Sequence, residues 1–370
     1  MDQLICGKCG SAFPLCDPRW RCDCGYLLDV EFAPVFALDK IAERKPTMWR
    51  YREAIPISDD ANVVTLDEGY TPLLRVSFDG VPVWMKQDHL FPTGSYKDRG
   101  ASVLMSKAKE LGIQRVVEDS SGNAGCAVAA YSAVAGIECA IYVPEHTAAA
   151  KLAQIRRYGA TLNLVPGERQ DTALAALEAA QGTYYASHSW NPFFLHGTKT
   201  FAFEVCEQLG WRSPDTVILP VGNGTLLLGA YLGFTELMGA GIVSSVPKLI
   251  AVQAEACAPL AAAFRGKLDS LPEIPARDTL AEGIAITSPI RGGQILRAVR
   301  DSGGHFVSVS EGEIKASLTQ MCRKGFYIEP TSAAATAGVS KYVRRLQSDE
   351  VIVSVLTGHG LKATEKMLAI

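Results

Sequence analysis

The chain has 370 residues, enough for two domains around a shared cleft or for one large domain. Hydrophobic residues make up 48% of it and charged residues 20%, a composition that supports a buried core and excludes a disordered chain. The net charge of −3 argues against nucleic acid as the main partner, because there is no basic surplus to neutralise phosphates.

The first residues and the apolar segments predict a cytoplasmic protein. No apolar run follows a basic start at the N-terminus, so we expect no secretory signal. The most apolar window, residues 124–143, contains Gly136 and Glu138. It predicts a buried helix followed by a buried strand rather than a membrane span. The ten cysteines are then expected to be thiols or metal ligands rather than disulfides.

Four of these cysteines form two pairs near the N-terminus. Cys6 and Cys9 make a CxxC pair, Cys22 and Cys24 make a shorter CxC pair, and a glycine follows each. Thiolates at such spacing on tight turns can bind one Zn²⁺. The short second pair leaves a second possibility open, a knuckle that folds without metal and packs its thiols together. Residues 1–30 are therefore predicted to be a zinc-ribbon-like segment, with zinc as a possible ligand.

The remaining elements follow in a regular order. Residues 32–57 contain three prolines and a charged stretch, which predicts an arm or linker with one short helix. Beyond residue 63, short apolar strands alternate with alanine-rich helices, which predicts parallel β-α-β units with sheets covered on both faces. The expected strands are 81–86, 116–118, 140–143, 161–165, 216–221, 249–253 and 351–356, and the expected helices are 100–111, 125–135, 148–158, 172–180, 200–209 and 226–238. Ligands of such sheets bind where strands end and helices begin.

Lys97 is the first candidate for chemistry. It follows a Pro-Thr-Gly turn and opens a helix rich in small residues. The positive end of the helix dipole favours a neutral amine, and a neutral amine can form a Schiff base with an aldehyde. The alternative is an ordinary solvated lysine, as most lysines are.

Three loops after strands are further candidates. Residues 120–125, Ser-Ser-Gly-Asn-Ala-Gly, can form a nest for an anion such as an α-carboxylate, with Asn123 donating to a phenolic oxygen. Residues 221–225, Val-Gly-Asn-Gly-Thr, can hold the phosphate of a small cofactor. Plain strand-to-helix turns are the alternative for both. Thr357 follows the last strand, where its hydroxyl can hydrogen-bond a pyridine nitrogen.

In this order, the segments resemble the fold-type II pyridoxal-phosphate enzymes, whose fold is tryptophan synthase β-like, and most closely the threonine synthases and their relatives. The resemblance includes the cysteine pairs and extends over nearly the whole chain through the motifs at 48–52, 68–73, 191–200, 281–284 and 329–333. It implies a homodimer of two-domain α/β chains. Residues 31–99 and 200–370 would form the large domain, and residues 100–199 a small mobile domain that closes on the substrate.

The resemblance also implies a role for each candidate. Lys97 would hold pyridoxal phosphate as a Schiff base and move protons to and from the substrate carbons, and Asn123 would contact the 3′-oxygen of the cofactor. Thr357 would contact the pyridine nitrogen. The cofactor phosphate would be bound by Gly222, Asn223, Gly224 and Thr225, and the substrate by Ser121, Gly122, Ala124 and Glu282.

Four positions depart from the threonine synthase pattern. Threonine is usual at Ala124, and the family often has arginine, glutamate and glutamine where this chain has Phe194, His196 and Thr198. An arginine at position 194 would suit a phosphorylated substrate. Threonine synthase, which converts O-phosphohomoserine and water to threonine and phosphate, is still the first expectation. The alternatives are a serine or threonine ammonia-lyase, β-replacement on O-phosphoserine as in cysteate synthesis, and a non-catalytic relative, against which Lys97 argues.

Overall fold

The computed structural model describes residues 2–147, 149–167, 169–268, 270–275 and 277–368. The chain forms two compact units, each built from two separate stretches of sequence. The first unit comprises Met1–Gly69 and Lys97–Thr198, and the second comprises Tyr70–Tyr96 and Lys199–Ile370. This division differs from the expected domains at residues 31–69 and 97–99, which cluster with the first unit, and at Lys199, which clusters with the second.

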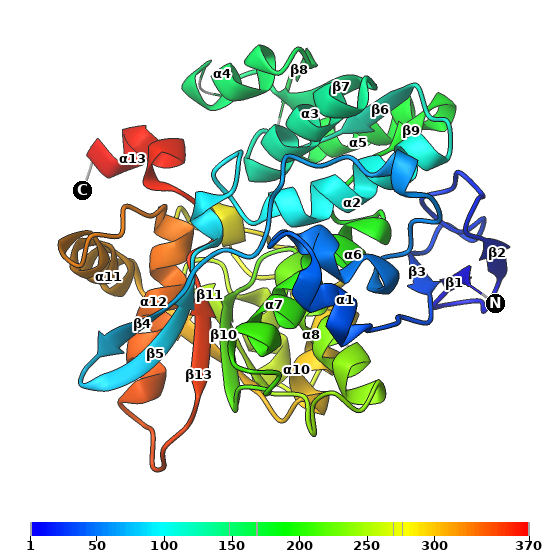
Figure 1. The fold of residues 1–370 in the computed structure, drawn as a ribbon. Helices are drawn as coiled ribbons and strands as arrows, with labels where there is room; N and C mark the ends of the chain where they lie inside the picture. Colours follow the sequence, from blue (N-terminus) through cyan, green and yellow to red (C-terminus); the bar gives the residue numbers. More distant parts are fainter. Residues whose placement is uncertain (1, 148, 168, 269, 276, 369–370) are drawn as a thin grey trace. The chain divides into compact units, whose positions relative to one another are not determined.

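A parallel four-stranded sheet in the order β8-β7-β6-β9 is the centre of the first unit. Its strands are β6 (Arg115–Glu118), β7 (Glu138–Pro144), β8 (Thr161–Val165) and β9 (Tyr184–Tyr185). The helices around it are α2 (Lys97–Glu110), α3 (Asn123–Ala135), α4 (Ala149–Arg157), α5 (Arg169–Ala179), the 3₁₀ turn η4 (Ala180–Gly182) and α6 (Phe193–Thr198). Figure 1 shows α2 running beside α3 and α6, with which it packs.

Alternation along the strands explains why helices cover both faces of this sheet. Val116 and Ile141 pack in one cluster with residues of α3. Val117 and Ala140, one position along in the same strands, pack in another cluster with Ala176 of α5. Successive side chains of a strand point to opposite faces, so strands that bury apolar side chains at successive positions require cover on both sides.

The N-terminal stretch completes the first unit. It contains a small antiparallel sheet in the order β2-β1-β3. Its elements are β1 (Gln3–Cys6), β2 (Ala12–Pro14), β3 (Leu28–Glu31), α1 (Leu38–Glu43) and the 3₁₀ helices η1 (Met48–Ala54) and η2 (Asp60–Asn62).

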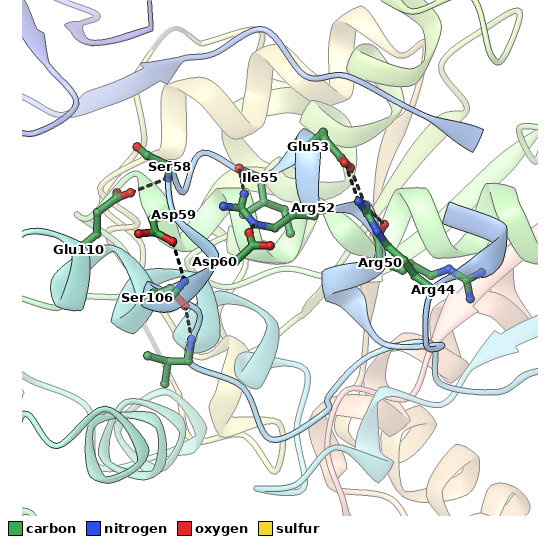
Figure 2. A network of polar contacts seen from close by, with 12 residues as sticks. Arg44, Arg50, Arg52, Glu53, Ile55, Ser58, Asp59, Asp60, Ser106 and Glu110 are labelled. Atoms are coloured by element: carbon green, nitrogen blue, oxygen red, sulfur yellow. Dashed lines mark hydrogen bonds and ion pairs between the residues drawn. The ribbon is translucent and has the colours of Figure 1, made fainter. Parts of the chain in front are cut away.

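The arm expected at residues 32–57 is a packed part of this unit rather than a loose linker. Trp49 is buried and its indole N–H donates to Ser102 Oγ of α2 at 2.9 Å. Ser102 in turn donates to the Val64 carbonyl at 2.8 Å, and the Val64 N–H donates to Ser106 Oγ at 2.8 Å. Figure 2 shows polar contacts of this segment, including the hydrogen bond that Ser106 Oγ accepts. The prolines and charges in the sequence suggested a loose connection, but the apolar residues between them fill the side of α2.

The second unit is built on a six-stranded sheet in the order β12-β11-β10-β13-β5-β4, parallel except for the antiparallel pair β4–β5. Its strands are β4 (Leu73–Phe78), β5 (Val81–Lys86), β10 (Thr216–Pro220), β11 (Lys248–Ala254), β12 (His305–Val309) and β13 (Ile352–Val355). Its helices are η3 (Asp88–Leu90), α7 (Thr200–Gln208), α8 (Thr225–Gly239), α9 (Pro259–Arg265), η5 (Glu282–Ile284), α10 (Gly292–Asp301), α11 (Glu311–Arg323), α12 (Pro330–Val343), η6 (Gly360–Ala363) and α13 (Thr364–Leu368). Helix α12 lies along β10, β11 and β13 (Figure 1).

The expected α/β architecture with parallel sheets is confirmed. The apolar window at residues 124–143 is helix α3 followed by strand β7, as expected. No helix in the described part of the chain is both long and apolar enough to cross a membrane. The antiparallel strand β4 is an addition to the predicted pattern. It pairs with β5 through the tight turn at Gly80, whose φ is +87°.

Candidate active site

Lys97 is the first residue of α2, as its place after the glycine turn predicted. Its Nζ lies 5.4 Å from the centroid of the Phe194 ring. Gly100, one turn along α2, faces the same ring, since a Cβ there would lie 2.2 Å from Phe194 Cε1. Phe194 is fully buried. An apolar ring thus lies beside the amine at the position where the threonine synthase pattern has an arginine.

The loop at residues 120–125 connects β6 to α3. The Gly122 N–H donates to Ser120 Oγ at 3.3 Å, and the Gly122 carbonyl accepts from the Cys126 N–H at 3.1 Å. Gly125 allows the loop to approach the helix, because a Cβ there would lie 1.8 Å from the Ser120 carbonyl oxygen. Asn123 begins α3, and Ser121 and Gly122 precede it. The expected nest therefore lies at a helix N-terminus, where backbone N–H groups attract an anion.

Two buried acidic residues directly ahead of this loop, Glu118 and Asp119, escaped the sequence analysis. Tyr185 of β9 donates its hydroxyl to Asp119 Oδ1 at 2.8 Å. His188 Nδ1 lies 2.8 Å from Glu118 Oε1, and its ring packs on the edge of Phe194 with centroids 6.0 Å apart. These partners are about 70 residues apart in the sequence. Since no short motif spans that separation, a motif search could not have found them.

In the second unit, the loop at residues 222–225 connects β10 to α8. Gly224 has a φ of +74°, which favours glycine. A Cβ at Gly222 would lie 2.9 Å from Ile284 Cα and 3.0 Å from the Gly283 carbonyl oxygen. The loop therefore lies against η5, so the structure brings the predicted phosphate loop and the predicted Glu282 segment together. Asn223 lies between the two glycines at the start of α8.

Glu282 itself has an ion pair within this unit. Its Oε1 lies 2.9 Å from Lys366 Nζ of α13, and half of its side-chain surface is exposed. The neighbouring Gly283 N–H donates to Thr331 Oγ1 at 3.1 Å. The 281–284 and 329–333 motifs, far apart in the sequence, are thus in contact.

Thr357 is held by hydrogen bonds to two buried side chains. It follows β13 and is buried, and its Oγ1 donates to Glu329 Oε1 at 3.1 Å. Ser332 Oγ lies 2.9 Å from Thr357 Oγ1 and accepts from the Thr357 N–H at 2.8 Å. Glu329 and Ser332 flank the first turn of α12, so they orient the threonine hydroxyl. The sequence analysis quoted both residues as part of a motif without giving them a role.

Tyr96 connects Thr357 with the glycine loop. Its backbone N–H donates to the Thr357 carbonyl at 3.0 Å, and its hydroxyl lies 3.2 Å from Thr225 Oγ1. Tyr96 therefore contacts both Thr357 and the predicted phosphate loop at residues 222–225. The next residue in the chain is Lys97.

Ser95, the residue before Tyr96, has spare hydrogen-bonding capacity. Its Oγ is buried and has no hydrogen-bond partner among the described residues. A buried hydroxyl without a partner costs free energy unless a ligand or water supplies one. This hydroxyl, the glycine loop and the oriented Thr357 fit a small phosphorylated ring such as pyridoxal phosphate.

Two histidines support the turn ahead of Lys97. His89 and His359 stack with ring centroids 5.9 Å apart, and the His359 backbone N–H donates to the Gly94 carbonyl at 2.9 Å. His359 Nδ1 accepts from the Leu361 N–H at 3.2 Å. Burial, with a contribution from His359, lowers the pKa of His89 to about 4. His89 is therefore neutral at pH 7.

Comparison with known proteins agrees with these features. Residues 64–358 match the family described as pyridoxal-phosphate dependent enzyme. The chain is 37% identical to the threonine synthase of Methanocaldococcus jannaschii, with 96% of this chain and 92% of that protein covered. It is 34% identical to the threonine synthase of Methanosarcina acetivorans, with 100% and 94% covered.

Solved structures share the fold. A threonine deaminase from T.th. superposes with a TM-score of 0.67 at 26% identity, covering 78% of this chain and 92% of that one. Maize serine racemase has a TM-score of 0.68 at 20% identity, covering 81% and 93%. The predicted fold-type II architecture is confirmed. The chain belongs to the family of pyridoxal-phosphate dependent enzymes, is threonine-synthase-like along its length, and is a lyase with pyridoxal phosphate as its cofactor.

Proposed function

We propose that the chain is a threonine synthase, which converts O-phosphohomoserine and water to threonine and phosphate. The observation that carries this proposal is the match to threonine synthases over nearly the whole of both chains, at 37% identity in one case. A match of that extent includes the N-terminal segment, which lies outside the region matched by the general family.

The residues present are suited to the cofactor. Pyridoxal phosphate, when bound, supplies an electron sink that makes the Cα–H of an amino acid acidic. Lys97 would hold the cofactor covalently, and its amine would carry protons to and from the substrate carbons. Asn123 would donate to the 3′-oxygen. The phosphate would lie at the N-terminus of α8, bound by Gly222, Asn223, Gly224 and Thr225.

Three further groups would orient the reacting molecules. Thr357 would contact the pyridine nitrogen, with its hydroxyl held by Glu329. Ser121 and Gly122, which precede α3, would bind the substrate carboxylate, with Ala124 beside them. The small mobile domain proposed at residues 100–199, with which residues 31–69 pack, would exclude water from the reacting carbon when it closes.

A β-elimination of the ammonia-lyase type is the second candidate. The observation that favours it is Phe194, which lies beside Lys97 Nζ where an arginine would suit a phosphorylated substrate. His196 and Thr198, on the same short helix, are also buried, so these three positions contribute no exposed charge for a substrate phosphate. Loss of an arginine anchor weakens phosphate binding through charge-assisted hydrogen bonds.

A substrate panel separates the candidates. The purified yellow protein is incubated with O-phosphohomoserine, O-phosphoserine, threonine and serine, and phosphate, threonine and keto acids are measured. We expect threonine and phosphate in equal amounts from O-phosphohomoserine. Keto acid from threonine, without phosphate release from O-phosphohomoserine, would instead support the ammonia-lyase. Phosphate release from O-phosphoserine that depends on added sulfite and gives no keto acid would support β-replacement. Lys97→Ala, which removes the Schiff-base amine, is the control that should lose every activity.

We also propose a homodimer and a cytoplasmic location. The homodimer follows from the family resemblance, and light scattering of the purified protein tests it. The cytoplasmic location is supported by the cysteines, none of which is paired in a disulfide in the described part of the chain, since unpaired thiols persist in reducing compartments. Fractionation of the source cells tests this location.

A further inference from the structure

The four cysteines of the N-terminal segment form a cluster that the proposed reaction does not use. Their Sγ atoms all lie within 4.8 Å of one another. The contacts cross between the two pairs, with Cys6 3.6 Å from Cys24 and Cys9 3.5 Å from Cys22. Zinc with Zn–S bonds of about 2.3 Å holds four tetrahedral sulfurs about 3.8 Å apart. The cluster therefore has the dimensions of a tetrathiolate site.

Two similar turns bring the thiols to one point. Cys6 accepts from the Gly10 N–H through its carbonyl at 3.0 Å, and Cys22 accepts from the Gly25 N–H in the same way at 2.8 Å. Both glycines have a positive φ, of +74° and +78°, which a residue with a side chain rarely adopts. The shorter CxC spacing of the second pair is thus compatible with the same arrangement.

The site is anchored on one side and open on the other. Cys6 is the last residue of β1 and pairs with Leu28 of β3. Cys6 and Cys22 are buried in the core cluster that contains residues of α3, whereas Cys9 and Cys24 are exposed. A metal ion could therefore enter from solvent and reach ligands that the core already holds.

We propose that Cys6, Cys9, Cys22 and Cys24 bind one Zn²⁺ that stabilises the first unit. Thiolate ligands in a closed tetrahedral set are typical of structural zinc and leave no open position for catalysis. Binding requires the four thiols to lose their protons, so zinc affinity falls as the pH is lowered.

The N-terminal segment also packs against strand β9 and the residues that follow it. Trp20, two residues before Cys22, packs edge-on against Tyr185 with ring centroids 4.9 Å apart and against Trp190 at 5.5 Å. Tyr185 donates to Asp119, which directly precedes the loop at residues 120–125. Zinc would thus stabilise the packing of Trp20 against β9 without itself contacting the loop at residues 120–125.

Metal analysis with two variants tests the proposal. The double variant Cys9→Ser/Cys24→Ser removes the two exposed ligands and leaves the buried pair in the core. Cys16→Ser is the matched control, because Cys16 is exposed in the same segment and lies outside the cluster. We expect one zinc per chain in the wild type and in Cys16→Ser, and at least tenfold less in the double variant. Equal zinc in both variants, or none in the wild type, would overturn the proposal.

Thiol reactivity of the wild-type holoenzyme is a second test, which needs no variant to fold. Cys9, Cys16 and Cys24 are the exposed thiols among the ten cysteines. With zinc bound, only Cys16 should react quickly with a thiol reagent, and a strong chelator should release Cys9 and Cys24. Fast reaction of all three before the chelator is added would contradict the zinc site. Both tests are independent of substrate turnover, so they stand or fall separately from the proposed reaction.

Discussion

The Thr357 hydroxyl makes two buried contacts that stabilise the folded protein. It donates to Glu329 and lies within hydrogen-bond distance of Ser332, and all three side chains are buried. Removing one partner of a buried hydrogen bond leaves the others unsatisfied, which costs more than the bond itself contributes. The hydroxyl therefore stabilises the protein even without a cofactor.

We predict that Thr357→Val lowers the free energy of unfolding of the cofactor-free protein by about 1–3 kcal/mol. Thr357→Ser, which retains the hydroxyl, should lose clearly less. Urea unfolding of both variants and the wild type measures the difference. Equal stability of the valine and serine variants would show that the Glu329 contact contributes nothing.

Arg44 and Glu53 form a second well-defined residue pair, which connects α1 to η1 (Figure 2). Two guanidinium nitrogens of Arg44 donate to the two carboxylate oxygens of Glu53, each at 2.6 Å. These hydrogen bonds lower the pKa of Glu53 from 4.5 to about 2. The folded state thus binds the Glu53 proton more weakly than the unfolded state does. The pair's contribution to stability is full above pH 4.5 and is lost as the pH falls towards 2.

We predict that Glu53→Gln costs about 1–2 kcal/mol at pH 7, allowing for solvent screening of a partly exposed pair. The difference from the wild type should shrink as the pH is lowered from 4.5 towards 2. Asp60→Asn is the control, because Asp60 pairs with Arg52 but is 81% exposed. It should change stability by no more than about 0.5 kcal/mol at either pH. A Glu53→Gln effect independent of pH would rule out the ion pair as its cause.

At the scale of elements, the backbones of helices α2 and α6 pack directly against each other at Gly197. A Cβ at Gly197 of α6 would lie 1.9 Å from the Arg99 carbonyl oxygen and 2.7 Å from Gly100 Cα. These are backbone atoms, so no side-chain rotation can relieve the contact. The same crossing holds Phe194 over Gly100 beside Lys97.

We predict that Gly197→Ala destabilises the protein by about 1–3 kcal/mol through overpacking. It should also shift the absorbance of the bound cofactor, because α2 carries Lys97 at its start. Gly182→Ala is the control, since no other atom lies within 4 Å of a Cβ at that position. Thermal unfolding and an absorbance spectrum of each variant measure both effects. A Gly197→Ala variant as stable as the control would mean that the helices can separate at little cost.

At the scale of the whole molecule, the chain passes between the two units three times, at residues 69–70, 96–97 and 198–199. The sheets and the main core clusters of the two units are separate. Lys97 begins a stretch of the first unit, while the proposed phosphate loop belongs to the second. A cofactor that binds the folded chain but not the unfolded chain stabilises the folded state by mass action.

We predict that pyridoxal phosphate at 100 times its dissociation constant stabilises the cofactor-free protein by about 2.7 kcal/mol. Pyridoxal at the same concentration, which lacks the phosphate, should stabilise it much less. Thermal unfolding with each compound measures the effect. Equal stabilisation by the two compounds would argue against phosphate binding at residues 222–225.

Much of the architecture and of the candidate site could be predicted because its signals are local. Apolar runs of strand length alternate with longer helical segments, and small residues follow strands 116–118 and 216–221 where helices begin. Helix α2 begins at Lys97 and helix α8 begins at Thr225, and a glycine turn precedes each of them. The backbone conformation of such turns depends on the residues themselves, so the sequence alone identifies them.

The sequence by itself therefore determined the alternation of strands and helices, the cofactor family and the positions of the candidate loops. Only the tertiary structure decided that residues 31–69 pack with α2 and that Glu329 and Ser332 orient Thr357. Each of these facts is a contact between residues distant in the chain. Such contacts depend on how the elements pack, and no local pattern records them.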